Sequence, residues 1–300
     1  MIRRDLHQRN RLAWDAATRA HSSHKSDMAG FLGAGGTTLF DEEVRLLLGR
    51  EGASLDAIRA AGERPLAGLR LLHAPCNAGQ DTLSLALLGA EVVGVDISEV
   101  AISEAQALSR AAGIPATFHR ADLFDWLPAA AAAGERFDRA FMSYGVLLWM
   151  SDLAAFVAGM AAVLRPGGRF VGLEFHPFVL LYDEQGRLAY PYSGGAQVVS
   201  PEGVGDYVAA SPEGLAPSGF LAGEVGFRNP HATHEFSWGV ADVLSAILGA
   251  GLTLEVVREY AHANGCRVWH DLAPQPGRRY APTGPAAPPM MLGWSARRPA

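Results

Sequence analysis

Apolar and polar residues follow two different periods between residues 69 and 175. Short apolar runs of strand length are separated by longer segments whose apolar residues recur at helical spacing. These patterns predict strands over 69–72, 91–95, 116–120, 137–142 and 169–173, and helices over 81–88, 99–111 and 152–164. Strands that alternate with helices form a parallel sheet with right-handed crossovers. The pattern therefore predicts an α/β fold with a mostly parallel sheet.

The pattern changes on both sides of this core. Amphipathic helices are expected before it, over 3–21 and 40–50. After Phe175 the periodicity is lost in a segment rich in Gly, Pro, Tyr and Ser, and it resumes as a helix over 238–249 and a strand over 252–259. Long irregular stretches in an α/β domain usually form lids or binding insertions. We expect four segments: an N-terminal helical cover (1–60), a core (61–176), a cap (177–235), and a C-terminal part of the sheet with a Pro-rich insertion (236–300).

Composition and charge favour a small-molecule partner. The chain has 300 residues and a formal net charge of −6, without a block of Lys or Arg. Nucleic acid and anionic membranes both need a basic surface, so neither is expected as a partner. Cys76 and Cys266 are the only cysteines and lack metal-ligand spacing, which predicts a reducing compartment and no zinc site. With no apolar leader and no long apolar stretch, we expect a cytoplasmic protein.

The first predicted strand ends in the segment Ala74-Pro-Cys-Asn-Ala-Gly-Gln-Asp81, which leads directly into a helix. Ligands of such sheets bind at the carboxyl ends of the strands. The second strand ends in Asp96, where a carboxylate can accept two hydrogen bonds from ribose hydroxyls, and Ile97 can pack on the base. After the third strand, Asp122 can accept from an adenine amino group. The sequence therefore predicts a nucleoside site at this edge.

Alternative interpretations of the same residues remain open. Asp96 could simply cap the helix that follows it. An oxidoreductase that binds a nicotinamide dinucleotide also places an acid at the end of the second strand, but this loop lacks Gly-x-Gly-x-x-Gly and keeps side chains where a pyrophosphate needs close backbone approach. His231, His234 and Glu235 suggest a metal, but the segment is irregular and has no third-ligand pattern, so no metal is expected.

Taken together, these segments resemble the class I S-adenosylmethionine-dependent methyltransferases. The resemblance covers roughly residues 69–175, and more weakly 234–297. It rests on Cys-Asn-x-Gly-Gln-Asp-Thr-Leu-Ser-Leu-Ala, on Gly-Ala-Glu-Val-Val-Gly-Val-Asp-Ile-Ser and on Leu-Arg-Pro-Gly-Gly-Arg-Phe. At the positions of the three glycines in the family's loop, this chain has Pro75, Asn77 and Gly79. In place of the acidic residue that begins the family's loop it has His73. Pro75 has no N–H, whereas Asn77 tolerates the left-handed conformation that the loop requires.

The resemblance implies a Rossmann-like three-layer sandwich. It further implies a seven-stranded, mostly parallel sheet whose last strand, over 290–297, is antiparallel. The implied cofactor is S-adenosylmethionine, with S-adenosylhomocysteine as its product. The residues expected to bind it are His73, Ala74, Cys76, Asn77, Gly79, Gln80, Asp81, Asp96, Ile97, Asp122, Leu123 and Ser143.

Catalysis needs few specific groups, because methyl transfer from a sulfonium is an in-line displacement in which positioning can suffice. The catalytic candidates are His176, Tyr144 and Glu174. His176 is the preferred base, although a buried histidine hydrogen-bonded to backbone would account for this residue equally well. An aromatic acceptor pocket, or ordinary lid core, is expected from Tyr144, Trp149, Tyr182, Tyr190, Tyr192, Phe236 and Trp238. Trp14 and its helix are expected either to cover the cofactor or to anchor the fold.

The expected function is methyl transfer to an oxygen or nitrogen of a small metabolite. Two alternatives of other classes stay open, namely a non-methylating reaction with the same cofactor and a binding protein that has lost its chemistry. The sequence leaves a homodimer open.

Overall fold

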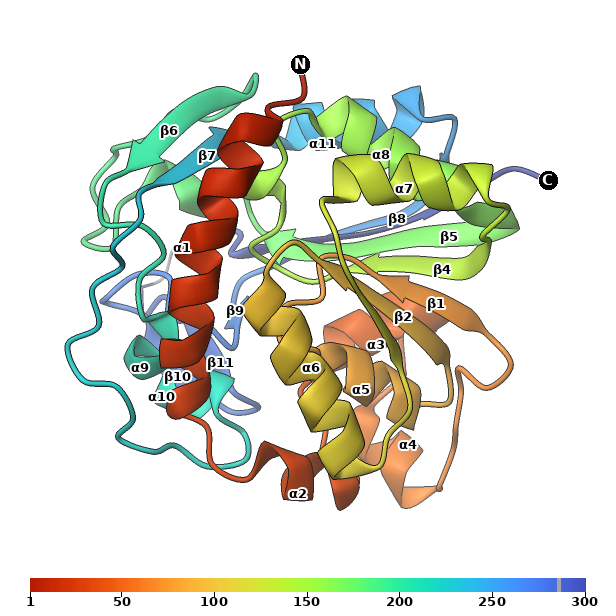
Figure 1. Cartoon of the computed structure of the whole chain (residues 1–300), viewed down its shortest axis with the longest axis horizontal. Helices are drawn as coiled ribbons and strands as arrows, with labels where there is room; N and C mark the ends of the chain where they lie inside the picture. The colour runs from red at the N-terminus through yellow and green to blue at the C-terminus, as the bar shows by residue number, and fades with distance from the viewer. Residues whose placement is uncertain (285–286) are drawn as a thin grey trace.

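The computed structural model describes residues 1–284 and 287–300. A seven-stranded sheet lies at its centre, in the order β3-β2-β1-β4-β5-β12-β8 (Figure 1). The strands are β1 (Arg70–His73), β2 (Glu91–Asp96), β3 (Thr117–Arg120), β4 (Phe137–Met142), β5 (Leu164–Phe175), β8 (Thr253–Tyr260) and β12 (Met291–Arg297). The first five pair in parallel, and β12 runs antiparallel between β5 and β8. This confirms the predicted mostly parallel sheet with its antiparallel last strand.

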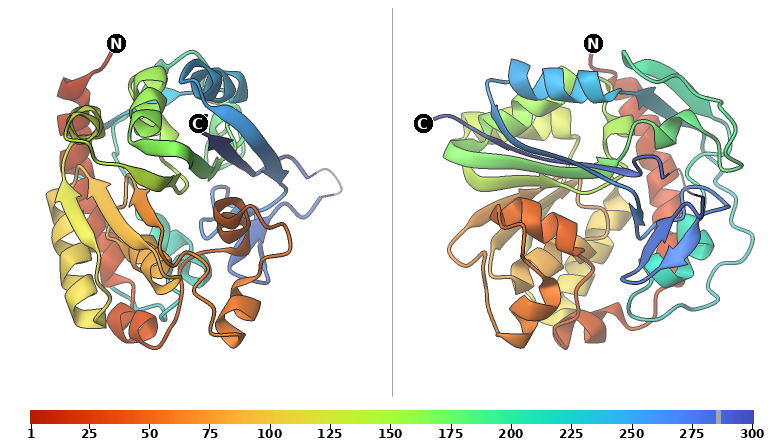
Figure 2. Two further views of the ribbon diagram at one scale, coloured as in Figure 1. Left: turned by 90° about the vertical axis from the view of Figure 1, so that its right-hand side faces the viewer. Right: turned by 180° about the vertical axis from the view of Figure 1, so that it is seen from behind.

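Helices cover both faces of the sheet and complete three layers (Figure 2). One face carries α3 (Asp41–Leu48), α4 (Leu55–Ala60), α5 (Gln80–Leu87) and α6 (Glu99–Ala112), and the other carries α7 (Leu123–Ala132), α8 (Leu153–Ala162) and α11 (Val240–Gly249). Successive strand residues point to opposite faces, so Leu71 joins the first core and Leu72 the second. Both layers are thus packed on fully buried strands, and the α/β sandwich fold is confirmed.

Four elements show the main differences from the sequence prediction. The segment before β4 forms the helix α7, which begins at its N-cap Asp122 and contains Pro128. The strand β5 begins at Leu164 instead of residue 169, because its Pro-Gly-Gly segment bulges where the pairing with β4 shifts register. Two strands, β6 (Ala196–Ser200) and β7 (Thr233–Ser237), pair within the segment where periodicity was lost.

The N-terminal helix α1 (Arg4–Ser23) crosses the edge of the sheet at which the parallel strands end. It lies between α6 and the β6–β7 ribbon, and is followed by the short helix α2 (Met28–Gly33) (Figure 1). The remaining cap and insertion elements are η1 (Leu147–Trp149), η2 (Val179–Leu181), α9 (Tyr207–Ala210), α10 (Pro212–Leu215), β9 (Ala263–Asn264), β10 (Ala273–Gln275) and β11 (Arg279–Ala281). In the described part of the chain, no helix combines the length and apolarity needed to cross a bilayer.

Candidate functional site

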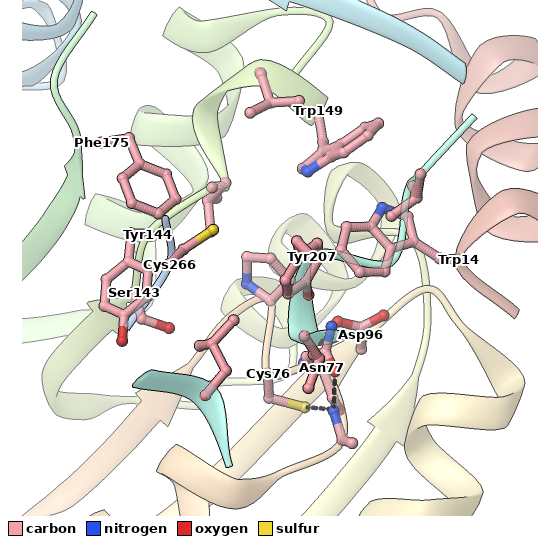
Figure 3. A pocket seen from close by; sticks show the side chains of 18 of the residues that line it. Trp14, Cys76, Asn77, Asp96, Ser143, Tyr144, Trp149, Phe175, Tyr207 and Cys266 are labelled. Atoms are coloured by element: carbon pink, nitrogen blue, oxygen red, sulfur yellow. Dashed lines mark hydrogen bonds between the residues drawn. The ribbon is translucent and has the colours of Figure 1, made fainter. Parts of the chain in front are cut away.

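A cavity of about 540 Å³ opens at the carboxyl edge of the parallel strands. One wall is formed by the ends of β1 to β4, and the other by α1 and the cap. Figure 3 shows Cys76, Asn77 and Asp96 on one side and Tyr144, Phe175 and Cys266 on the other, with Trp14, Trp149 and Tyr207 nearby. Most of the residues singled out by the sequence therefore share one cavity with residues of the cover and cap.

The loop between β1 and α5 is shaped by its own backbone. Asn77 adopts a positive φ of 47°, and its side chain accepts from the N–H of Ala78 at 2.7 Å. Gly79 has a φ of 75°, and a Cβ at this position would lie 2.7 Å from the Cβ of Ala105 and 2.9 Å from Phe118. Only glycine satisfies both conditions. The loop thus turns tightly against α6 and β3 despite having only one of the family's three glycines.

Asp96 is almost fully buried and fastens this loop to β2. Its Oδ2 accepts from the N–H of Asn77 at 2.8 Å, and its Oδ1 accepts from the N–H of Ser98 at 2.9 Å. Each carboxylate oxygen has two lone pairs, so both retain acceptor capacity on the cavity side. Burial raises the pKa of Asp96, while these backbone N–H groups oppose the shift. Ser98, and not Asp96, caps α6, because the Ser98 hydroxyl accepts from the N–H of Ala101. Asp96 fastens the loop and can still receive ribose hydroxyls.

Asp122 is engaged by a residue that the sequence reasoning did not identify. Its Oδ1 accepts from the N–H of Phe124, and its Oδ2 lies 2.7 Å from Nδ1 of His7 on α1. The Nε2 of His7 lies 2.7 Å from Oγ of Ser151. Burial raises the pKa of Asp122, but His7, the N–H of Phe124 and the charge of Arg4 together outweigh it and lower the pKa overall. An adenine amino group would have to share this carboxylate with His7. Because His7 and Asp122 lie 115 positions apart, no local pattern could have revealed the pair.

His73 stands where the family has an acid, and it is uncharged. Its Nδ1 lies 2.9 Å from Oγ1 of Thr82 and its Nε2 lies 3.2 Å from Oγ of Ser143. Burial lowers the pKa of His73 to about 4. Ala74, which was also expected to bind cofactor, is completely buried and donates its N–H to Phe141 O, away from the cavity wall. The other expected cofactor residues lie on that wall.

The first turn of α5 contacts the N-terminal segment. The hydroxyl of Thr38 donates to Asp81 Oδ1 at 2.5 Å, and Lys25 Nζ donates to Gln80 Oε1 at 3.0 Å. Thr38 and Lys25 both line the cavity. The sequence reasoning missed both residues, because they lie in an irregular segment far from the loop they contact.

Two of the three catalytic candidates do not line the cavity. The ring of His176 is held by Glu259 at Nε2 (2.9 Å) and by the N–H of Phe178 at Nδ1 (3.1 Å). Neither His176 nor Glu174 lies on the cavity wall, so the structural alternative for the histidine applies. Glu174 accepts four backbone N–H groups, from Gly145, Val146, Leu147 and Phe175. Burial raises the pKa of Glu174 to about 7, although the four N–H donors act to lower it.

Tyr144, the third candidate, does face the cavity, where its ring packs at 5.3 Å on Phe175. Burial raises its pKa well above the usual value, so the hydroxyl keeps its proton. The cavity is also lined by Trp149, Tyr182 and Tyr190. The other expected aromatic residues, Tyr192, Phe236 and Trp238, lie outside it. The Trp14 ring meets that of Trp149 edge-on at 5.5 Å.

The metal interpretation of the β7 region gains no support. The Nδ1 of His234 lies 3.1 Å from the amide of Gln197. Within residues 1–284 and 287–300, no group of three or more His, Cys, Asp or Glu side chains is arranged to hold an ion.

Comparisons with known proteins agree with this geometry. Residues 71–168 match the model of the methyltransferase domain family. A ubiquinone biosynthesis O-methyltransferase of Methylobacterium sp. (strain 4-46) is 38% identical over 109 residues, which are 36% of this chain and 42% of that protein. Its counterpart in Mesorhizobium japonicum is 40% identical over 105 residues, 35% of this chain and 40% of that protein. The match thus spans less than half the length of these relatives.

The structural comparison extends beyond the matched segment. An S-adenosylmethionine-dependent methyltransferase of Clostridium acetobutylicum superimposes with a TM-score of 0.51 at 12% identity, over 86% of this chain and 97% of that one. At this identity the likeness concerns the fold alone. Residues 71–168 are thus similar to the methyltransferase domain family, and the sheet has the fold of S-adenosylmethionine-dependent methyltransferases.

Proposed function

We propose that this protein transfers the methyl group of S-adenosylmethionine to an oxygen or nitrogen of a small metabolite. The observation that carries the proposal is the single cavity joining the β1–α5 loop and Asp96 to an aromatic chamber around Tyr144. A cofactor and an acceptor in that cavity would be in contact. Oxygen is the favoured target, because relatives of the core segment are named O-methyltransferases.

The sheet wall fits the adenosyl part of the cofactor. Asp96 would receive the ribose hydroxyls, as its free lone pairs allow. Ile97 and Leu123 line the same region and would pack on the base. The bound cofactor supplies a methyl group on a positively charged sulfur. The residues of this chain would then contribute by binding, by alignment and by excluding water from the cavity.

The cover and cap fit the acceptor. Trp149, Tyr182 and Tyr190 offer large apolar surfaces that suit a flat molecule. The protonated Tyr144 hydroxyl can donate a hydrogen bond that orients it. Since alignment can suffice for in-line transfer, we assign no base. A homodimer, a cytoplasmic location and the exclusion of nucleic acid stay predictions from the sequence.

The test uses the purified chain and cofactor with an isotopically labelled methyl group. S-adenosylhomocysteine binding is first measured by calorimetry, and a panel of phenols, catechols, carboxylic acids and amines is then incubated with the labelled cofactor. We expect one acceptor class to gain the labelled methyl in the mass spectrum, with equivalent formation of S-adenosylhomocysteine. Cofactor consumption with an unmethylated product would instead favour a non-methylating reaction, and absent binding would refute the proposal.

A further inference from the structure

Lys25 is the only lysine among the 300 residues of this chain. It lies between α1 and α2, only partly exposed, and it lines the cavity beside the first turn of α5. An ammonium group in such a place has lost much of its hydration, which is costly unless acceptors replace the water. Each of its three N–H donors therefore needs an acceptor.

Only one of those donors has a partner in the described part of the chain. Nζ donates to Gln80 Oε1 at 3.0 Å, and no carboxylate among the described residues comes within ion-pair distance of it. The charge of Asp81 raises the pKa of Lys25, but Asp81 accepts no hydrogen bond from the Lys25 ammonium. The ammonium thus retains donors that can receive an acidic group from a ligand.

The other strong cation on the cavity wall is already committed. The guanidinium of Arg278 donates to the carbonyl oxygens of Thr38 and Leu39 at 2.8 and 2.9 Å, and it stacks on the ring of Phe40 at 4.2 Å. His73, which lies closer to the loop, is uncharged at neutral pH. Backbone carbonyls thus engage most of the Arg278 guanidinium, whereas Lys25 lies beside the first turn of α5 and, in the described part of the chain, keeps donors without a partner.

The cap fixes where this ammonium lies. The backbone of Lys25 forms an isolated antiparallel bridge with Phe220. On either side, Leu221 donates its N–H to His24 O at 2.8 Å and Ser26 donates its N–H to Gly219 O at 2.9 Å. With the backbone clamped from the cap side, the side chain extends to the cofactor loop at Gln80. Such a placement is preorganised, which reduces the entropy lost on binding.

We propose that the Lys25 ammonium binds the α-carboxylate at the amino-acid end of the cofactor. The inference rests on the proposed function, since it assumes that S-adenosylmethionine occupies the cavity. That end of the cofactor is a zwitterion, and the adjacent Asp81 carboxylate on the same wall matches its ammonium. Lys25 thereby provides the charge that the altered loop, with His73 and Pro75, does not.

Two nucleosides distinguish this role from a general effect on the site. S-adenosylhomocysteine carries the carboxylate, whereas 5′-methylthioadenosine has the same thioether nucleoside without the amino-acid end. Calorimetry with Lys25→Met should show S-adenosylhomocysteine binding weakened on the order of tenfold to a hundredfold, as for a lost charge-assisted hydrogen bond. Binding of 5′-methylthioadenosine should match that of the unaltered protein, and Lys25→Arg should restore most of the lost affinity.

Each other outcome has a definite meaning. Arg19→Met removes a cation from the exposed face of α1 and should leave both affinities unchanged. If Lys25→Met weakens both nucleosides equally, Lys25 only supports the structure and the inference is overturned. Equal S-adenosylhomocysteine affinity in Lys25→Met and the unaltered protein overturns it as well. If the unaltered protein fails to bind S-adenosylhomocysteine, the proposed function fails instead.

The pH dependence of S-adenosylhomocysteine binding gives a second, independent test of the role of Lys25. Burial lowers the pKa of Lys25 to about 8, opposed by Asp81 on α5 and Glu104 on α6, and the Lys25 charge also acts on His21 near the end of α1. Above that pH the ammonium loses its proton, so S-adenosylhomocysteine affinity should fall. The fall should be absent in Lys25→Arg, because a guanidinium stays charged. An identical pH profile for the two proteins would contradict the role of Lys25.

Discussion

The two walls of the cavity are built in different ways. On the sheet wall, the hydrogen bonds involve backbone groups. The N–H of Cys76 donates to Val95 O, and the Asp96 carboxylate accepts from the N–H groups of Asn77 and Ser98. On the cover wall, side chains hold segments together across the sequence, as Asn10 does with the backbone of His234, 224 positions away. The first wall follows from sheet topology, whereas the second depends on individual side-chain pairs.

The sheet that carries the first wall should be the more sensitive to a single substitution. Glu174→Ala would leave four buried backbone N–H groups without their acceptor, so we expect the free energy of unfolding to fall by about 3 kcal/mol or more. Chemical denaturation measures this, with Glu63→Ala at an exposed position as the control. A loss below about 1 kcal/mol would mean that water or local rearrangement replaces the carboxylate.

Asp96 tests the binding role of the same wall. Asp96→Ala should weaken S-adenosylhomocysteine binding by about 2 kcal/mol or more, as for a lost pair of charge-assisted hydrogen bonds. Glu99→Ala removes an exposed carboxylate from the first turn of α6 and should bind normally in the same calorimetric titration. Unchanged affinity in Asp96→Ala would remove the ribose assignment and leave Asp96 only its role in fastening the loop to β2.

The cover wall should respond locally. His7→Ala removes the link between Asp122 and Ser151, and we expect a loss of about 1–2 kcal/mol in stability. Amide hydrogen exchange should accelerate within residues 4–23 and stay slow in the central strands. Arg9→Ala, on the exposed side of the same helix, is the matched control. Uniform acceleration across the sheet would show that the two walls are not independent.

The smallest effect is expected at the outer end of the chamber. Tyr190 and Tyr192 are equally exposed, at 40%, but only Tyr190 lines the cavity. Tyr190→Ala should raise the KM for the methylated acceptor by an amount equivalent to about 0.5–1.5 kcal/mol, and leave S-adenosylhomocysteine affinity intact. Steady-state kinetics of the two alanine variants measure the difference. Equal KM values would place the acceptor elsewhere in the cavity.

Sequence patterns predicted the sheet wall well because its chemistry is local. The β1–α5 loop and Asp96 lie directly at the ends of apolar strands, so their meeting follows from parallel pairing. The same reasoning placed Glu174 and His176 at a strand end, but β12 pairs with β5 from Arg169 to Phe175, and the His176 N–H donates to Met290 O. Phe175 lines the cavity, whereas its two neighbours do not, as expected where successive strand residues point to opposite faces.

The cover wall was largely unpredictable for a related reason. His7 and Lys25 carry no motif, and their partners are fixed only when the N-terminal segment and cap fold onto the core. The strands β6 and β7 pair across a long irregular segment. Because the pairing closes a long loop, no local sequence pattern predicts it. The Trp14 ring was expected to cover the cofactor or to anchor the fold, and it lines the cavity while packing on Trp149.

The way α1 is attached has a consequence for turnover. The helix α1 is not part of the central sheet. It is held by individual hydrogen bonds, such as His7 with Asp122, and by a small apolar cluster around Ala13, Ala17 and Val204. Separating these contacts costs less than opening a paired central strand. We therefore expect the helix to lift as a unit while the sheet stays folded, so that the exchange of spent cofactor for fresh cofactor proceeds at the rate of this gating motion.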